Sequence, residues 1–343
     1  MMRRALALAE KGLYSATPNP RVGCVVTRGA QVIGEGWHEK AGGPHAEVVA
    51  LRDIDAEGAT VYLNLEPCNH HGRTPPCAEL LVRKKVARVV AAMSDPDPQA
   101  RGGGERLRAA GIAFEPGLLE AEARELNIGF VSRVTRGRPW VRLKLAATLD
   151  GRTALSDGRS QWITGAEARR DGHRWRARAC AILTGIGTVK ADDPQLTVRE
   201  VETPRQPLRV VVDSRLETPA SAKVLKGAPP LVFAARQGTL PNAEVVVLPN
   251  ARGKVELPQM LEELARRGVN ELHVEAGYRL NGSLLREGCV DELLVYLNPS
   301  LLGDAAQGMA ELPAAASLDE RRRLRIVSLE RVGEDLRLLL RPA

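Results

Sequence analysis

The chain has 343 residues, of which 44% are hydrophobic and 27% charged, and its formal net charge is +7. This composition excludes a disordered chain, and the length exceeds what one hydrophobic core usually encloses, so we expect two domains. No apolar run reaches the roughly 20 residues that a membrane helix needs, and no secretory apolar stretch follows the first residues. We therefore expect a cytoplasmic protein with no membrane partner.

The basic charge balance raises the question of a nucleic-acid partner. Aromatic residues make up only 3% of the chain, which is too few for a base-stacking platform, and the basic clusters are short. We expect small anionic ligands such as phosphates and no nucleic acid. The five cysteines are odd in number, which favours metal ligation or simple burial over a disulfide framework.

Up to about residue 138, short apolar runs alternate with helical patterns. The expected strands are residues 22–27, 60–65 and 87–93, and the expected helices are residues 5–12, 45–52 and 78–85. This alternation predicts an α/β sheet covered by helices. Charged residues, Gly and Pro cluster at residues 135–139, which places a boundary between domains 1–138 and 139–343.

The second half again alternates strands with helices. Its expected strands are residues 140–146, 181–184, 208–212, 231–234, 244–247, 271–275 and 292–297, and its clearest helix is residues 258–268. These patterns predict a second α/β domain. Within the first half, the run of Gly102, Gly103 and Gly104 favours a loop or a close helix approach over a phosphate cradle.

The sequence His-Ala-Glu at residues 45–47 is followed by Pro67-Cys68 and, after eight further residues, by Cys77. A His-x-Glu followed by two cysteines is typical of zinc deaminases that act on nucleobases. One imidazole and two thiolates leave a fourth zinc position open for water, and zinc lowers the pKa of bound water from 15.7 to about 7. Glu47 would carry the proton of that water to the ring nitrogen and to the leaving ammonia.

The same residues allow a plainer interpretation, in which His45 caps or packs a helix and the cysteines are small buried side chains. The combination of the motif with a preceding strand favours zinc. The remaining cysteines lie in or beside predicted strands and helix ends, and we expect them in the core: Cys24, Cys180 and Cys289. His70 and Arg73, in the segment between Cys68 and Cys77, are donors for a phosphate or a ring oxygen, or else solvated surface residues.

The first half resembles the bifunctional deaminase-reductases of riboflavin biosynthesis, and the resemblance covers nearly the whole chain. It rests on residues 17–23, on residues 45–47 and on residues 67–77, whose cysteine spacing differs from that of ordinary cytidine deaminases. The resemblance implies a cytidine-deaminase-like three-layer domain in which Glu47 is catalytic. It implies zinc ligation by His45, Cys68 and Cys77, and substrate contacts from Asn19, His38, His70 and Arg73. Family members often have Lys at the position of Arg73, which keeps the charge and changes the donor geometry.

The second half has no Rossmann Gly-x-Gly-x-x-Gly after its first strand. Its polar and Gly-rich segments could bind phosphates or simply form turns. Five of them resemble the reductase domain of the same family, a relative of dihydrofolate reductase: residues 144–151, 160–164, 185–189, 191–194 and 274–277. The resemblance implies an α/β domain whose NADPH contacts are Ala146, Trp162, Thr188, Asp192, Ser214, Gly277, Tyr278, Arg279, Leu280, Asn281, Gly282 and Ser283. It implies these substrate contacts: Ser160, Arg176, Leu196, Arg199 and Glu275.

The resemblance implies two reactions on small phosphorylated pyrimidines. The first is zinc-dependent deamination of 2,5-diamino-6-ribosylamino-4(3H)-pyrimidinone 5′-phosphate, and the second is NADPH-dependent reduction of 5-amino-6-(5-phosphoribosylamino)uracil to the ribitylamino product. Two other classes stay open from the residues alone. One is a nucleoside or tRNA deaminase whose second half only binds substrate, and the other is a nucleic-acid-binding protein with structural zinc. A homo-oligomer is compatible with the sequence.

Overall fold

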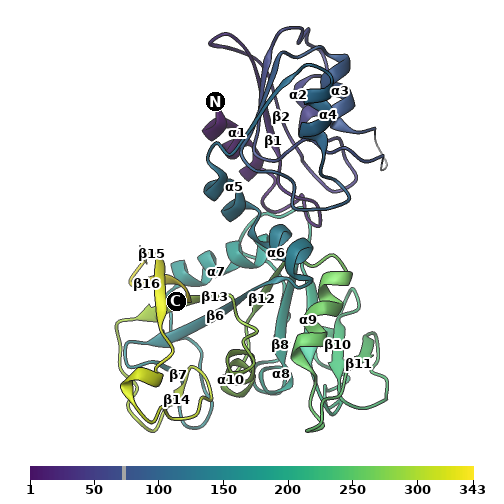
Figure 1. Cartoon of the computed structure of the whole chain (residues 1–343). Helices are drawn as coiled ribbons and strands as arrows, with labels where there is room; N and C mark the ends of the chain where they lie inside the picture. The colour runs from purple at the N-terminus through teal and green to yellow at the C-terminus, as the bar shows by residue number, and fades with distance from the viewer. Residues whose placement is uncertain (72–74) are drawn as a thin grey trace. The chain divides into compact units, whose positions relative to one another are not determined.

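The computed structural model describes residues 1–71 and 75–343 and divides the chain into two compact units, Met1–Gly137 and Arg138–Ala343 (Figure 1). Residues 135 and 136, expected in a linker, still belong to helix α6 (Ile128–Arg136). Gly137 ends this helix in the left-handed conformation, with φ of 67°, a common way for a helix to stop. Among the described residues, no helix is both long enough and apolar enough to cross a membrane.

The first unit is built on a five-stranded sheet with the order β2-β1-β3-β4-β5. Its strands are β1 (Gly23–Arg28), β2 (Gln31–Trp37), β3 (Thr60–Leu63), β4 (Arg88–Ala91) and β5 (Ala113–Pro116). β1 pairs antiparallel with β2 and β3, and β3, β4 and β5 run parallel. The helices besides α6 are α1 (Met2–Glu10), α2 (Ala46–Ala50), α3 (Cys77–Arg83), α4 (Gly103–Ala109) and α5 (Glu120–Leu126).

Helices cover both faces of this sheet. Cys24 and Val26 of β1 belong to one core together with residues of α2, α3 and α4. Val25, between them in the strand, belongs to a second core with residues of α1 and α5. Because successive strand residues point to opposite faces, a strand buried on both sides must be apolar throughout. The predicted three-layer arrangement is confirmed.

The second unit is built on a nine-stranded sheet with the order β11-β10-β9-β8-β12-β6-β13-β16-β15. Its strands are β6 (Trp140–Thr148), β8 (Ala181–Gly185), β9 (Leu208–Val212), β10 (Leu231–Ala234), β11 (Glu244–Val247), β12 (Glu271–Val274), β13 (Glu292–Asn298), β15 (Leu324–Val332) and β16 (Asp335–Pro342). The strands from β11 to β13 are parallel, and β16 and β15 add to the sheet in antiparallel fashion. The carboxyl ends of seven strands therefore share one edge, where ligands bind in open α/β sheets.

The helices of the second unit connect these parallel strands. They are α7 (Ala166–Arg178), α8 (Ile186–Asp192), α9 (Leu257–Arg266) and α10 (Tyr278–Arg286). The short strands β7 (Arg152–Ala154) and β14 (Gln307–Gly308) form a separate pair. Buried residues of α9, such as Met260 and Leu264, pack with the apolar runs of the central strands to form the main core.

Candidate active sites

Three potential metal ligands converge in the first unit: His45, Cys68 and Cys77. Their ligand atoms all lie within 4.8 Å of one another. The Nδ1 atom of His45 lies 3.2 Å from the Sγ atom of Cys77 and 3.6 Å from that of Cys68. His45 precedes α2 and Cys77 begins α3, so two helix starts bring the ligands together. One imidazole and two thiolates are a donor set that suits zinc, so the residues fit the metal that the motif predicts.

The two cysteines of this cluster differ in acidity. Contact with the Cys77 thiol lowers the pKa of Cys68 to about 4, and His45 contributes in the same direction. The backbone N–H of Cys77 also donates to the Cys68 sulfur over 3.4 Å. The neighbouring Cys68 sulfur and burial raise the pKa of Cys77. Two adjacent thiolates repel each other, and a divalent cation between them would stabilise both in the deprotonated form.

Glu47 lies in the first turn of α2 and its side chain is buried. Burial is the main cause that raises its pKa, while His45 acts in the opposite direction. A carboxyl group with a raised pKa takes up and releases a proton near neutral pH more readily than an exposed one, which suits general acid-base work. The structure thus places Glu47 beside the ligand cluster, in an environment that fits a proton carrier.

Asn19 and His38 lie next to each other and to the ligand cluster. The Nδ2 atom of Asn19 is 3.0 Å from Nε2 of His38, and Nδ1 of His38 is 2.9 Å from the carbonyl oxygen of Pro44. His38 also makes an edge contact with His45, with 5.7 Å between the ring centroids. Burial lowers the pKa of His38, so a neutral ring that donates from Nδ1 and accepts at Nε2 satisfies both contacts.

Two buried asparagines hold the segment that carries Asn19. The backbone N–H of Arg21 donates to Asn127 over 2.8 Å, and Asn64 donates to the Arg21 carbonyl over the same distance. These bonds join the segment to β3 and to the start of α6. His70 is exposed, and Arg73 lies outside the described residues. Cys24 and Cys289 are buried and Cys180 is partly buried, which confirms their expected place in the core.

The glycine run at residues 102–104 supports the loop that carries Cys68. A Cβ atom on Gly103 would lie 1.9 Å from the carbonyl oxygen of Pro67, and one on Gly104 would lie 2.3 Å from the Phe114 ring. The buried carboxylate of Glu66 accepts the N–H group of Gly104 over 2.8 Å. The run is therefore a close approach of α4 to the metal loop, as the sequence predicts.

Gly103→Ala is expected to destabilise the first unit by at least about 2 kcal/mol, because the added methyl group meets backbone that has no room to move. Urea unfolding measures the loss. Gly172→Ala in α7 is the matched control, since no atom lies within 4 Å of its added Cβ; it should be neutral or slightly stabilising. Equal stability of the Gly103→Ala and parental proteins would contradict the close approach.

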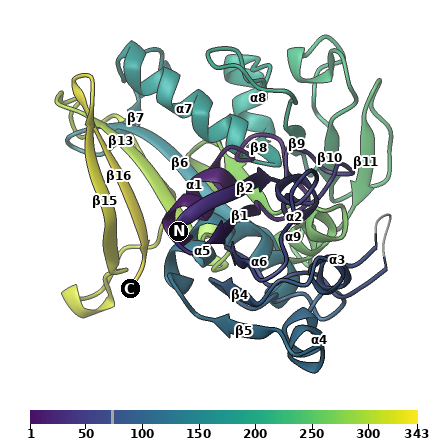
Figure 2. The same cartoon turned by 90° about the horizontal axis from the view of Figure 1, so that it is seen from above.

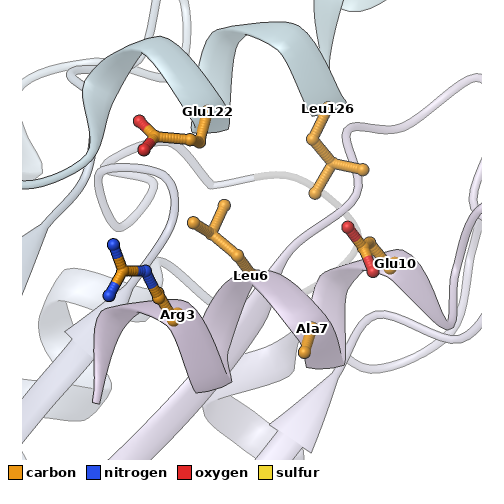
Figure 3. Close-up of a pocket in the computed structure, with 6 residues that line it drawn as sticks. All are labelled: Arg3, Leu6, Ala7, Glu10, Glu122 and Leu126. Atoms are coloured by element: carbon orange, nitrogen blue, oxygen red, sulfur yellow. The ribbon is translucent and has the colours of Figure 1, made fainter.

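A separate pocket lies between α1 and α5 of the first unit (Figure 3). Its lining residues are Arg3, Leu6, Ala7, Glu10, Glu122 and Leu126. It contains none of the predicted site residues. α1 and α5 pack on one face of the sheet, whereas α2 and α3, which position the metal ligands, pack on the other. This pocket is therefore distinct from the candidate deaminase site.

In the second unit, the expected cofactor residues gather at the carboxyl edge of the parallel strands. Ala146 lies near the end of β6, Thr188 follows β8 in α8, and Ser214 comes two residues after β9. Gly277 follows β12 and lies so close to α8 that a Cβ on it would sit 3.5 Å from the Thr188 hydroxyl. Gln161 donates to Asp192 over 3.5 Å, which brings the segment of Trp162 to the same helix.

The start of α10 fits an anionic group of the cofactor. Gly277 precedes this nine-residue helix in an extended conformation, so the first backbone N–H groups of the helix have no partner within it. Two residues that were expected to contact the cofactor, Asn281 and Gly282, pack against the protein. Asn281 is buried and donates to the Met309 carbonyl, and a Cβ on Gly282 would lie 2.2 Å from the carbonyl oxygen of Glu311. These two residues fix the helix in place.

Arg176 and Glu275 form a paired contact at the same edge. Nε and Nη2 of Arg176 donate to the two carboxylate oxygens of Glu275 over 2.5 and 2.7 Å, and Nη1 donates to the Thr197 carbonyl. Burial disfavours the carboxylate, but Arg176, His273 and Lys144 outweigh it and hold the pKa of Glu275 well below its usual value. Glu275 is therefore ionised at neutral pH.

Leu196 and Arg199 lie in the segment around Thr197, whose carbonyl accepts a hydrogen bond from Arg176. Arg199 donates from its side chain to the Thr197 hydroxyl over 3.1 Å, and Leu196 is buried with a positive φ of 52°. Ser160 is partly buried in the segment before α7. Lys144 was not among the expected site residues. Burial lowers the pKa of Lys144, and Glu275 opposes that shift only in part. The available signal in the sequence is a lysine within the largely apolar strand β6.

Comparison with known proteins supports the deaminase interpretation of the first half and the reductase interpretation of the second. Residues 1–93 match the cytidine and deoxycytidylate deaminase zinc-binding region, and residues 139–338 match the RibD C-terminal domain. The chain is 44% identical to the riboflavin biosynthesis protein RibD of Escherichia coli strain K12, over 99% of this chain and 98% of the relative. The chain belongs to the RibD family. The RibD protein of Haemophilus influenzae is 43% identical, over 99% of this chain and 96% of the relative.

Solved RibD structures share the fold over the whole chain. One from Acinetobacter baumannii superimposes with a TM-score of 0.93 at 42% identity, covering 100% of this chain and 98% of that one. A diaminohydroxyphosphoribosylaminopyrimidine deaminase/5-amino-6-(5-phosphoribosylamino)uracil reductase from Thermotoga maritima gives a TM-score of 0.91 at 33% identity, covering 100% and 97%. RibD membership confirms a bifunctional deaminase and reductase of riboflavin biosynthesis, with zinc and NADPH as cofactors.

Proposed function

We propose that the first unit deaminates 2,5-diamino-6-ribosylamino-4(3H)-pyrimidinone 5′-phosphate and that the second unit reduces the aminouracil product with NADPH. One observation carries this proposal: the chain contains two separate sites. The first has a buried glutamate beside a His/Cys/Cys cluster, and the second has an arginine-glutamate pair at a sheet edge. The activities named for the relative from Thermotoga maritima support the choice of substrates.

His45, Cys68 and Cys77 would hold zinc, which when bound activates water for attack on the ring carbon that carries the exocyclic amine. Glu47 would accept a first proton from the water and pass it to the ring nitrogen, and it would then carry the second proton, from the hydroxyl added to the ring carbon, to the departing ammonia. The raised pKa of Glu47 makes its protonated form accessible during this transfer. Asn19 and His38 lie beside the cluster and would orient the pyrimidine ring, while His70 and Arg73 would supply donors for the phosphate.

At the carboxyl edge of the second unit, the main chain at the start of α10 together with Thr188, Asp192 and Ser214 would hold the cofactor. Further contacts would come from Ala146, Trp162, Tyr278, Arg279, Leu280 and Ser283. NADPH when bound supplies the hydride for C1′ of the ribosyl group. The pairing with Glu275 fixes the Arg176 guanidinium, and Arg199 would bind anionic oxygens of the sugar phosphate. Ser160 and Leu196 would complete the substrate side.

Turnover of the diaminopyrimidine substrate tests the proposal. Ammonia release should proceed without NADPH, and loss of NADPH absorbance should require either prior deamination or the deaminated compound itself. A nucleoside deaminase whose second unit only binds substrate would release ammonia and leave NADPH unchanged. A protein that gives neither signal with the loaded metal would contradict both assignments.

The zinc assignment has its own prediction. Purified parental protein is expected to contain about one zinc per chain, and Cys68→Ser and Cys77→Ser should lose most of it, because each removes one of three ligands. Metal analysis by mass spectrometry measures the content. Cys24→Ala is the matched control, since Cys24 is buried in β1 outside the cluster, and this variant should keep its zinc. Unchanged zinc in both serine variants would refute the assigned ligands.

A further inference from the structure

His273 is a buried titratable side chain to which neither proposed reaction gives a role. It lies in β12 and its exposed fraction is 0%. It pairs with Arg142 of the parallel strand β6, so both side chains point to the same face of the sheet. Helix α7, which Figure 2 shows beside β6, covers this face, and the Arg142 guanidinium lies 4.4 Å from the centre of its Trp175 ring. An imidazole in this place must find its polar partners within the protein.

Among the residues that the structure describes, the His273 ring has one hydrogen-bond partner, the carboxylate of Glu275. Nε2 of His273 lies 3.1 Å from Oε1 of Glu275, two residues further along the chain. Nδ1 is equally buried, and no described atom forms a hydrogen bond with it. A hydrogen on Nε2 therefore gives the carboxylate a donor. The other tautomer would turn a lone pair toward the carboxylate and bury an unpaired N–H group, which costs more free energy.

The surroundings of the ring favour its neutral form. Burial lowers the pKa of His273, and Arg142 and Arg176 act in the same direction, whereas Glu275 opposes them. A protonated ring would be a further buried cation beside two arginines, which disfavours it. His273 is thus suited to donate one hydrogen bond to Glu275 without adding a charge to the substrate side of the site.

This hydrogen bond makes the two carboxylate oxygens of Glu275 unequal. Oε1 accepts from Nε of Arg176 over 2.5 Å and from the His273 ring, whereas Oε2 accepts from Nη2 of Arg176 over 2.7 Å. Each oxygen has two lone pairs, so the described contacts fill Oε1 and leave one acceptor position on Oε2. The Glu275 side chain is 19% exposed, which leaves it accessible to a ligand.

We propose that His273 is a positioning residue of the reductase, which occupies Oε1 of Glu275 and thereby leaves Oε2 to accept a hydrogen bond from a sugar hydroxyl of the substrate. This inference rests on the proposed function, in which Glu275 contacts the substrate. Arg176 contacts both oxygens and does not distinguish them, whereas His273 contacts only one. A sugar carries several hydroxyls, and a single fixed acceptor selects the orientation in which C1′ faces the cofactor.

Substitutions that remove or keep the donor test this proposal. His273→Leu keeps a buried side chain but loses the hydrogen bond to a charged group, and it should lower the reductase kcat/KM for the deaminated substrate at least about tenfold. The KM for NADPH should stay near the parental value, because His273 acts on the substrate side. A general loosening of the sheet edge would raise both KM values.

His273→Gln and His273→Asn form a matched pair for the same measurement. The amide nitrogen of Gln reaches the place of Nε2, whereas that of Asn reaches only the place of Nδ1. The Gln variant should recover most of the parental kcat/KM, and the Asn variant should resemble His273→Leu. Gln and Leu are similar in size, so packing alone does not separate them. A folded Gln variant no better than the Leu and Asn variants would contradict the donor role.

The tautomer of His273 gives a readout that needs no activity. Nitrogen NMR of protein with ¹⁵N-labelled histidines shows which ring nitrogen carries the hydrogen, and the His273 signals are those missing from His273→Gln. We expect a neutral ring with its hydrogen on Nε2 at neutral pH. A hydrogen on Nδ1, or on both nitrogens, would overturn the proposal.

Glu275→Gln distinguishes failure of this inference from failure of the proposed function. Parental reduction by Glu275→Gln would remove Glu275 from the substrate contacts and overturn both. A Glu275→Gln variant that loses reduction, together with a folded His273→Leu variant that keeps it, would overturn the inference alone. In the Glu275→Gln background, His273→Leu should have no further effect, since it acts through that carboxylate. Thermal unfolding checks the fold, and ammonia release, which depends on the first unit, should stay unchanged in every variant.

Discussion

Glu47→Gln is expected to lower the deamination rate by at least about 1,000-fold while reduction of the already deaminated substrate continues at the parental rate. Glutamine nearly keeps the size of the side chain and still forms hydrogen bonds, but it cannot carry the proton that water loses and ammonia gains. Glu47 is buried beside the ligand cluster, so no solvent-exposed group replaces it directly. Ammonia release and the loss of NADPH absorbance measure the two reactions separately.

The control for this variant is its zinc content, which should stay near the parental value because the three ligands remain. The fold permits the two reactions to be separated, since Glu47 lies in the unit Met1–Gly137 and the reductase candidates lie in Arg138–Ala343. A folded, zinc-loaded Glu47→Gln protein that deaminates at the parental rate would show that Glu47 is not the proton carrier. Loss of the reduction step as well would contradict the division of the two sites.

The sequence identifies the deaminase site because its chemistry is carried by residue types that few other roles require. A His-x-Glu and two cysteines point to zinc, and the structure brings all three ligands within 4.8 Å. The sequence also predicts strands that are buried on both faces, such as β10, because they are continuous apolar runs. The predicted bounds of β9, β10 and the edge strand β11 agree with the structure residue for residue.

Two strands that the sequence does not predict, β2 and β15, depart from the local pattern of a regular strand. β2 contains Gly34 and Gly36, which are unfavourable in strands, and a Cβ on either would meet the backbone of α2 at 2.3 or 2.6 Å. The helix that carries Glu47 can lie on β2 only because these residues lack side chains. β15 was missed because its bulge breaks the alternation of apolar and polar residues.

The contacts of the reductase site could not be predicted from the sequence because they join distant residues. Arg176 and Glu275 are 99 positions apart, and only the parallel order of β8, β12 and β6 brings their elements to one edge. Lys144 makes a further long-range interaction of this kind, because its charge acts on Glu275 from the adjacent strand β6. Such a cluster depends on strand order, which no local pattern specifies.

Arg176→Ala is expected to reduce the reductase kcat/KM by at least about 100-fold and to leave deamination unchanged. The variant loses the fixed guanidinium that we propose faces the substrate, and it leaves the largely buried Glu275 carboxylate without its bidentate partner. Breaking a buried pair by removing one member typically costs about 3–5 kcal/mol, so the second unit should also become less stable. Arg176→Lys is the conservative control. It keeps the charge but loses the paired donors, and it should retain more activity than the alanine variant.

The pH dependence of this stability loss distinguishes the pair from a surface contact. Arg176 holds the pKa of Glu275 well below its usual value, and burial favours the protonated form once the guanidinium is gone, although His273 and Lys144 remain beside it. The pKa of Glu275 should therefore rise in Arg176→Ala. A buried carboxyl with a raised pKa costs most stability at high pH, where it must ionise, and the cost falls as protonation becomes possible. The difference in unfolding free energy between parent and variant should shrink from pH 8 to pH 5. A difference that is constant over this range would show that the pKa of Glu275 does not rise above its usual range when Arg176 is removed.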